Sequence, residues 1–219
     1  MRARLTTLVA AAVIAAGCAA APKPDYTRFF QNHPRSILVV PPMNNTTAVE
    51  APDVFATTIT VPIAERGYYI FPVYLVADLL RDIGLTNEGL IHQLPANRFR
   101  EIFGADAVLF VTIKDWTTKY VLLASSVTVT ASYKLVDTKT GQVIWEGERR
   151  AVYQSSGSNI IAILVSALVT TTVDYRPLAR EANKKVTDSP GTGLPAGPYH
   201  AEFEKDYDRY SREREGALK

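Results

Sequence analysis

The chain has 219 residues, of which 47% are hydrophobic and 21% charged, a composition typical of a globular protein rather than a disordered one. Its formal net charge of +2 gives no electrostatic reason to expect nucleic acid or a strongly acidic substrate as a partner. Only one cysteine is present, so intrachain disulfides cannot hold the fold together.

The first 17 residues have the pattern of an export signal. Arg2 and Arg4 precede an apolar run, residues 5–16, and Gly17 follows it. The run is too short for a transmembrane helix, which needs about 20 residues. We therefore expect residues 1–17 to be a signal peptide.

The end of this signal contains the cysteine. Ala15-Ala16-Gly17-Cys18 resembles a lipobox, in which the cysteine becomes the acylated first residue after cleavage. Ala15 departs from the Leu, Val or Ile usual at that position. We expect Cys18 to be the lipid attachment site and Ala15, Ala16 and Gly17 to be recognised by the signal peptidase. The alternative is an ordinary secretory signal with a chance cysteine.

Acylation would fix the chain durably to a membrane, because several acyl chains bind far more strongly than one. Ala19 follows the cysteine, where an Asp commonly retains enteric lipoproteins at the inner membrane. The resemblance therefore implies an outer-membrane anchor with the domain facing the periplasm, and surface exposure as an open alternative. Residues 18–35, rich in Ala, Pro and polar side chains, predict a tether.

Strands and helices alternate in the first half of the domain expected at 36–183. The β-branched run at 36–40 predicts a buried strand. A helix is expected from Asp53, as its N-cap, to Gly67, with Pro62 inside it. The other expected elements are a strand at 68–71, a helix at 76–83, a short turn capped by Thr86, a helix at 96–103 and a buried strand at 107–113.

The second half predicts an antiparallel hairpin. Residues 126–135 alternate apolar and polar side chains, as in a strand with one solvated face. Residues 137–141 predict a tight turn, and 142–153 the returning strand. The fold class expected is therefore α/β, a mixed sheet with a C-terminal antiparallel hairpin and helices packed on it.

Residues 158–173 carry no charge and are too few for an ordinary membrane span. A buried core helix is the first interpretation, and an oligomer interface or a membrane-inserted hairpin are the alternatives. The remainder, 184–219, predicts a linker at 188–198 and a charged run at 202–215. That run is either a peripheral helix or a disordered tail.

No residue pattern indicates catalysis or a cofactor. The three histidines, His33, His92 and His200, lack the spacing of a zinc site, and no phosphate-binding glycine loop is present. Aspartates at predicted strand ends are usually turn formers; those in question are Asp106, Asp115 and Asp137. We expect no enzyme activity, cofactor or metal.

Aromatic side chains gather near the second strand and on the hairpin. Most aromatics in a strand pattern belong to a core, but exposed Tyr and Trp often anchor a protein partner. The candidates for partner binding are Tyr68, Tyr69, Trp116 and Trp145.

Three stretches resemble known proteins. The hairpin LVDTKTGQVIWEG at 135–147 is similar to one in envelope lipoproteins such as LpoB and CsgG. The strings PIAERGYYIFPV at 62–73 and REIFGADAVL at 100–109 resemble a family of bacterial lipoproteins of unknown function, of the meningococcal surface-antigen type. This resemblance covers about residues 1 to 180. It implies a fold like the N-terminal domain of TolB, and it carries over no catalytic residues.

Together these patterns predict a non-enzymatic, outer-membrane-anchored periplasmic module that binds other envelope proteins in assembly or transport. One alternative is a subunit or accessory of a CsgG-like secretion complex, in which the chain forms a homo-oligomer. An envelope hydrolase that uses Asp106, Asp115 or Asp137 is the remaining alternative.

Overall fold

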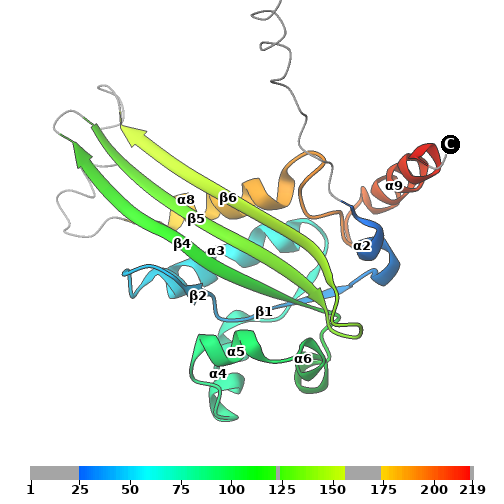
Figure 1. Cartoon of the computed structure of the whole chain (residues 1–219), viewed down its shortest axis with the longest axis horizontal. Helices are drawn as coiled ribbons and strands as arrows, with labels where there is room; N and C mark the ends of the chain where they lie inside the picture. The colour runs from blue at the N-terminus through cyan, green and yellow to red at the C-terminus, as the bar shows by residue number, and fades with distance from the viewer. Residues whose placement is uncertain (1–24, 122–123, 156–173, 218–219) are drawn as a thin grey trace, which may run out of the picture.

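The computed structural model describes residues 25–121, 124–155 and 174–217, which form a mixed sheet with helices on both faces (Figure 1). The strand order is β3-β1-β4-β5-β6, and β2 also pairs with β4. The strands β1, β2 and β3 run parallel to their neighbours, whereas β4, β5 and β6 are antiparallel. The expected fold class is confirmed. The strands are β1 (Ser36–Val39), β2 (Met43–Asn44), β3 (Tyr69–Ile70), β4 (Ala107–Val121), β5 (Ala124–Asp137) and β6 (Val143–Ser155).

The helices divide between the two faces of the sheet. α3 and α8 cover one face, α4, α5 and α6 cover the other, and α2 and α9 lie side by side at one end of the sheet (Figure 1). The helices are α2 (Thr27–Asn32), α3 (Ala51–Glu65), α4 (Val73–Asp82), α5 (Glu88–Gln93), α6 (Ala96–Phe103), α8 (Arg176–Asp188) and α9 (Phe203–Ala217).

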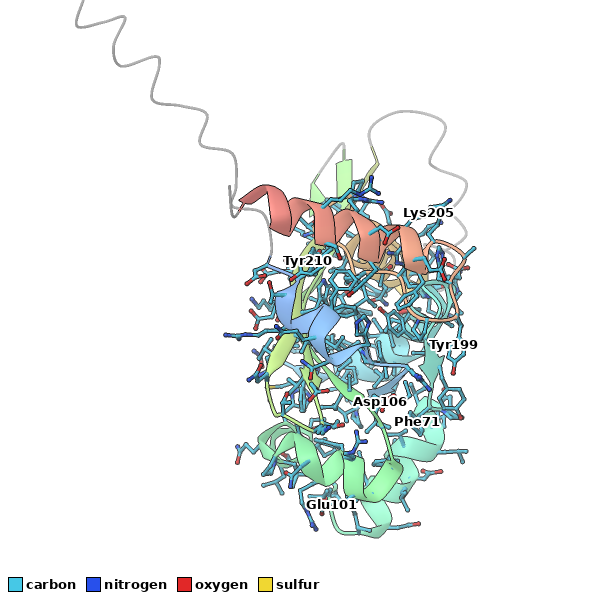
Figure 2. All side chains as sticks on the ribbon, turned by 90° about the vertical axis from the view of Figure 1, so that its right-hand side faces the viewer. Phe71, Glu101, Asp106, Tyr199, Lys205 and Tyr210 are labelled. Atoms are coloured by element: carbon cyan, nitrogen blue, oxygen red, sulfur yellow. The ribbon has the colours of Figure 1, made fainter. Side chains whose placement is uncertain are left out.

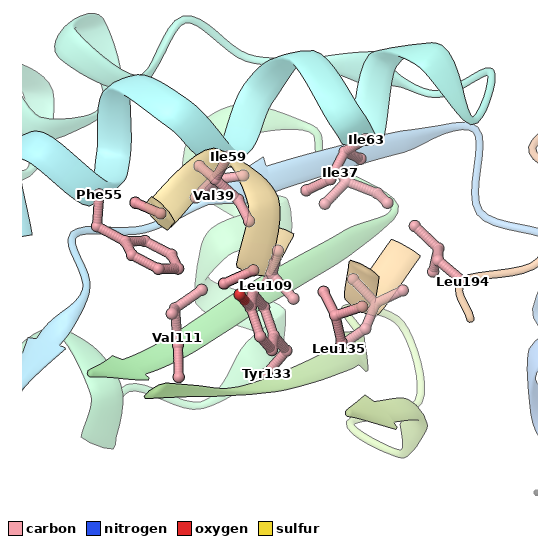
Figure 3. Close-up of a cluster of buried hydrophobic side chains, with 14 of the residues drawn as sticks. Ile37, Val39, Phe55, Ile59, Ile63, Leu109, Val111, Tyr133, Leu135 and Leu194 are labelled. Carbon is pink, nitrogen blue, oxygen red and sulfur yellow. The ribbon is translucent and has the colours of Figure 1, made fainter. Parts of the chain in front are cut away.

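The larger core lies between the sheet and the α3–α8 layer (Figure 3). Successive side chains of a strand point to opposite faces, so Ile37 and Val39 face this core while Leu38 and Val40 face the smaller one. Leu194, from the loop after α8, closes one end of the larger core. The smaller core lies under α4, α5 and α6.

The alternation predicted at 126–135 is confirmed. Val129, Tyr133 and Leu135 are buried under α3 and α8, whereas Lys134 is exposed on the opposite face. The turn expected at 137–141 is also present, because the Asp137 carboxylate accepts hydrogen bonds from the amides of Lys139 and Thr140 at 3.1 and 2.6 Å.

Strand β4 continues eight residues past the expected end at Ile113. A register shift between Ile113 and Asp115 accompanies this continuation, and polar residues follow it. The apolar pattern stops at that point although the backbone pairing with β5 does not. The far ends of β4, β5 and β6 therefore project beyond the helices as a three-stranded extension (Figure 1).

Two predicted helix caps are wrong. Helix α3 begins at Ala51, with Glu50 as its N-cap, so Asp53 lies inside the first turn, where a carboxylate also favours the helix dipole. The α5 cap is Asn87 rather than Thr86, and its side chain accepts a hydrogen bond from the Leu90 amide. The ends at Gly67 and Gly104 follow the prediction, since both glycines have positive φ angles of 82° and 72°.

Two segments expected outside the domain pack into it. Phe29 and Phe30 of α2, in the expected tether, are buried. Residues 193–197, in the expected linker, are buried as well. The Tyr68 hydroxyl donates to the Pro195 carbonyl at 2.7 Å, and the Gly197 amide donates to the Arg66 carbonyl at 2.7 Å. These are contacts between distant parts of the chain, which composition does not reveal.

Candidate functional site

The predicted lipidation site lies outside the described residues. This holds for Cys18 and for Ala15, Ala16 and Gly17, and also for the uncharged segment 158–173. Within the part of the chain that the structure describes, every helix is too short or too polar to cross a membrane.

Three of the four candidate aromatics are buried. Tyr68 bonds to the backbone as described above, Trp116 stacks on Tyr175 with ring centroids 4.7 Å apart, and Trp145 directs its indole N–H toward the Thr192 carbonyl at 3.5 Å. Burial makes these rings part of the fold rather than the surface. Tyr69 is 55% exposed and remains a candidate partner contact.

The candidate acid and base residues have local structural partners. The carboxylate of Asp106 accepts hydrogen bonds from the amides of Arg35 and Ser36, at 3.1 and 3.2 Å, and ties β1 to the start of β4. Asp115 accepts a hydrogen bond from the Thr117 hydroxyl at 2.8 Å. Among the described residues, no three His, Cys, Asp or Glu side chains gather as a metal site would require.

His92 is half-buried between α5 and the sheet. Its Nε2 lies 2.9 Å from the Pro41 carbonyl, and the ring packs edge-on against Phe110 at 5.1 Å. Burial lowers the pKa of His92 below its ordinary value. The neutral ring therefore donates to the carbonyl and fastens α5 to the end of β1, which is a structural role.

An apolar surface lies along the outer side of α4. Leu75, Leu79 and Ile83 recur every four residues and are 66%, 40% and 49% exposed. The inner side of the same helix buries Val76 and Leu80 in the smaller core. We call the three exposed residues the α4 ridge.

Other features border the ridge. Tyr69 and Tyr74 are also exposed, and the Tyr69 ring packs edge-on against Phe71 with centroids 5.2 Å apart. Asp78 and Asp82 each follow a ridge residue by three positions, so both carboxylates lie beside the ridge. Arg81 pairs with Asp78 at 2.7 Å, so the margin carries two carboxylates and one guanidinium. The surface is thus apolar with a weakly acidic margin.

A concave site lies where α2 and α9, from the first and last described parts of the chain, come together. A cavity of about 370 Å³ is enclosed by α2, the loop after α8 and α9. Its apolar wall comes from Tyr26, Phe30, Leu194 and Pro195, and Arg66 contributes the positive charge from the domain body. We call these five residues the chain-end groove. Helix α9 lies across it, with Tyr210 between α9 and α2 (Figure 2).

Asp206 of α9 makes the polar contacts of this site. Its Oδ2 accepts a hydrogen bond from the Ala196 amide at 3.0 Å and lies 3.4 Å from Nη2 of Arg66. The Nε of Arg66 donates to the Leu194 carbonyl at 2.9 Å, which holds the guanidinium in place. An amide and a guanidinium thus converge on one carboxylate, a charge-assisted arrangement.

Tyr26 closes the groove from the N-terminal side. Its hydroxyl donates to the Gly193 carbonyl at 2.7 Å, and burial raises the pKa of Tyr26 to about 12. The sequence did not predict this site, because residues 18–35 were expected to be a tether and residues 188–198 a linker. The available signal was the apolar content of those segments, namely Phe29, Phe30 and Leu194.

Comparisons with known proteins agree on one family. The profile of the family described as "Putative lipoprotein GNA1162-like" matches residues 24–192. A lipoprotein of Neisseria meningitidis serogroup B is 40% identical over an alignment of 156 residues, and the match covers 68% of this chain and 70% of that protein.

A solved structure of the same family is also similar. The crystal structure of lipoprotein GNA1162 from Neisseria meningitidis superposes with a TM-score of 0.54 at 36% identity, covering 63% of this chain and 97% of that one. The PelC dodecamer from Paraburkholderia phytofirmans gives a TM-score of 0.47 at 15% identity, over 79% of this chain and 96% of that one. The family match spans most of the domain, and the resemblance found in the sequence is confirmed. The chain belongs to the GNA1162-like family of lipoproteins.

Proposed function

We propose that this protein is an outer-membrane-anchored periplasmic lipoprotein that acts as a non-enzymatic docking module for other envelope proteins in assembly or transport. The observation that carries this proposal is the α4 ridge, because an exposed apolar strip on an otherwise well-packed domain usually marks an interaction site. Acylated Cys18 supplies the attachment, and Ala19 favours the outer membrane.

The charges beside the ridge favour a protein partner with basic residues. Helices that bind membrane surfaces carry an excess of Lys and Arg on their polar face, whereas the ridge is bordered by Asp78 and Asp82, with Arg81 paired to Asp78. A second copy would place the same patch on both sides of a two-fold axis, and antiparallel pairing of two α4 helices would bring these carboxylates together. A basic protein surface would instead be attracted to these carboxylates.

The anchor is tested by labelling cells with a palmitate analogue. The wild-type chain should incorporate the label and fractionate with the outer membrane, and Cys18→Ala should lose both properties. Equal labelling of the variant would remove the anchor from the proposal.

The docking surface is tested by placing a photo-crosslinking residue at Leu79 in cells. The matched control position is Val61 on α3, which is 53% exposed and lies outside the ridge. A specific adduct is expected at Leu79 alone, and it should disappear in the Leu75→Lys variant and weaken when Asp78 and Asp82 are both replaced by Lys. An adduct unaffected by these changes, or one made with lipid only, would refute this partner.

A second candidate is a homo-oligomeric subunit or accessory of a CsgG-like complex. The observation that favours it is the three-stranded extension. Within the described residues, the end of β4 beyond β2 pairs only with β5, and β6 likewise pairs only with β5. Unpaired strand edges are templates for pairing with another chain. A strictly monomeric mass in detergent, measured by light scattering, would exclude this candidate.

A further inference from the structure

Helix α9 is a polar helix held to the domain by a small number of side chains. Most of the residues from Phe203 to Arg212 are exposed, and the apolar contacts of this part come from Phe203, Tyr207 and Tyr210. Tyr210 stacks on Phe30 with ring centroids 4.5 Å apart, and its hydroxyl donates to Oγ1 of Thr27 at 2.7 Å. A helix with so little apolar surface gains its position from specific contacts rather than from general burial.

Two of these contacts form a recognisable pair. Asp206 and Tyr210 are four residues apart, so they lie on the same side of the helix. Asp206 meets Arg66 and the Ala196 amide, and Tyr210 meets the ring of Phe30. The groove thus contacts one carboxylate and one aromatic ring that lie one helical turn apart.

The helix does not fill the groove. The cavity of about 370 Å³ remains between α9, α2 and the loop after α8. The groove residues Tyr26, Phe30 and Arg66 also lie inside the family match, residues 24–192, whereas α9 begins at Phe203. The groove is therefore built largely by the family domain, and α9 is an addition that occupies it loosely.

We infer that the chain-end groove is a docking site for an acidic, aromatic helix of a partner protein, with Asp and Tyr one turn apart, and that α9 is its intramolecular occupant. Charge complementarity supports the choice of partner, because Arg66 and the Ala196 amide both contact the Asp206 carboxylate. The cavity lining also includes Asp188, Glu202 and Arg209. This inference deepens the proposed docking function and rests on it for the biological setting.

Intramolecular occupancy sets a threshold for the partner. A tethered segment competes at an effective concentration on the order of millimolar. A partner helix of similar affinity is then excluded, and one that adds contacts in the unfilled cavity displaces α9. Helix α9 is thus a competitive intramolecular ligand, and only a partner helix that binds the groove more tightly can displace it.

The test uses the full chain in detergent and a labelled peptide of residues 199–217. In the Asp206→Ala/Tyr210→Ala variant, α9 should leave the groove, so trypsin should cleave faster at Lys205 and Arg209. Fluorescence anisotropy should then show that the peptide binds this variant at least tenfold more tightly than the wild type. The matched control is Asp208→Ala on the exposed side of α9, which should behave as the wild type.

Two further arms identify the groove. Adding Arg66→Ala to the double variant should abolish peptide binding, and a peptide carrying both alanines should not bind. Equal binding to wild type and double variant, no binding to either, or binding that survives Arg66→Ala would overturn the inference. Circular dichroism confirms that each variant is folded. None of these results depends on Cys18 or on the α4 ridge, so failure here is distinguishable from failure of the proposed function.

Discussion

The sharpest stability prediction concerns a buried polar chain that ties α8 to the rest of the domain. The Tyr133 hydroxyl on β5 donates to Oδ1 of Asn183 at 2.7 Å, and Nδ2 of Asn183 donates to Oγ1 of Thr58 at 3.0 Å. The Thr58 hydroxyl in turn donates to the Phe55 carbonyl at 2.8 Å. All three side chains are buried, so none can exchange its partner for water.

Tyr133→Phe removes one hydroxyl and keeps the ring. Asn183 then holds a buried acceptor without its donor, which costs about 1–3 kcal/mol of unfolding free energy. For a domain of this size each kcal/mol corresponds to about 2–4 °C in Tm. Urea unfolding followed by tryptophan fluorescence measures the loss, and Tyr199→Phe, on an exposed ring, is the matched control expected within about 0.5 kcal/mol of wild type.

A double-mutant cycle tests the reasoning. Asn183→Leu alone also destabilises, because it leaves Tyr133 without an acceptor. The combined Tyr133→Phe/Asn183→Leu variant should cost less than the sum of the two, since both partners are then apolar. Additive losses, or a Tyr133→Phe variant as stable as Tyr199→Phe, would refute the claim that the pair acts as a unit.

Three other predictions follow from particular side chains. Leu194→Ala should lower the unfolding free energy by about 2–5 kcal/mol in denaturant titrations, because Leu194 is part of the core. A loss as small as that of a surface substitution would mean that residues 193–197 form a linker and not part of the core. Burial raises the pKa of Tyr26 from 10.0 to about 12, so the unfolded chain loses this proton first and stability falls as pH rises through 10 to 12; Tyr26→Phe should show a shallower decline there. The lowered pKa of His92 has the opposite effect. The unfolded chain gains the proton first below about pH 6.5, so the unfolding free energy falls with acidification. His92→Gln should therefore flatten the plot of unfolding free energy against pH between about pH 7 and 5.

Local chemistry accounts for the elements that the sequence predicts well. The turn at 137–141 needs only an Asp that bonds to the following amides and a glycine with a positive φ, and both are adjacent in the chain. Helix α6 matches its predicted bounds because Gly104 ends it. The alternation along β5 predicts its buried face for the same reason, because successive side chains of a strand point to opposite faces of the sheet.

Burial at the chain ends depends on long-range contacts and was not predictable in this way. Residues rich in Pro and Gly read as a linker, yet Pro195 receives a hydrogen bond from Tyr68, which is 127 residues away in sequence. The candidate site was the least predictable part, because its walls come from segments far apart in sequence, around Tyr26 and around Leu194. Aromatic content alone also could not separate core rings from exposed ones, and the burial of Trp116 and Trp145 depends on Tyr175 before α8 and on the loop after α8.

The two proposed surfaces are well separated, because α4 and α9 lie far apart in both views (Figures 1 and 2). If Cys18 is acylated, it lies seven residues before Asp25 in the sequence, a reach of at most about 25 Å. The chain-end groove, with Tyr26 in its wall, is then held near the membrane. A helix that displaces α9 would come from a membrane-proximal protein, while the α4 ridge stays free for a different one. Loss of ridge crosslinks should therefore leave peptide binding at the groove unchanged, as expected of a module that bridges two partners.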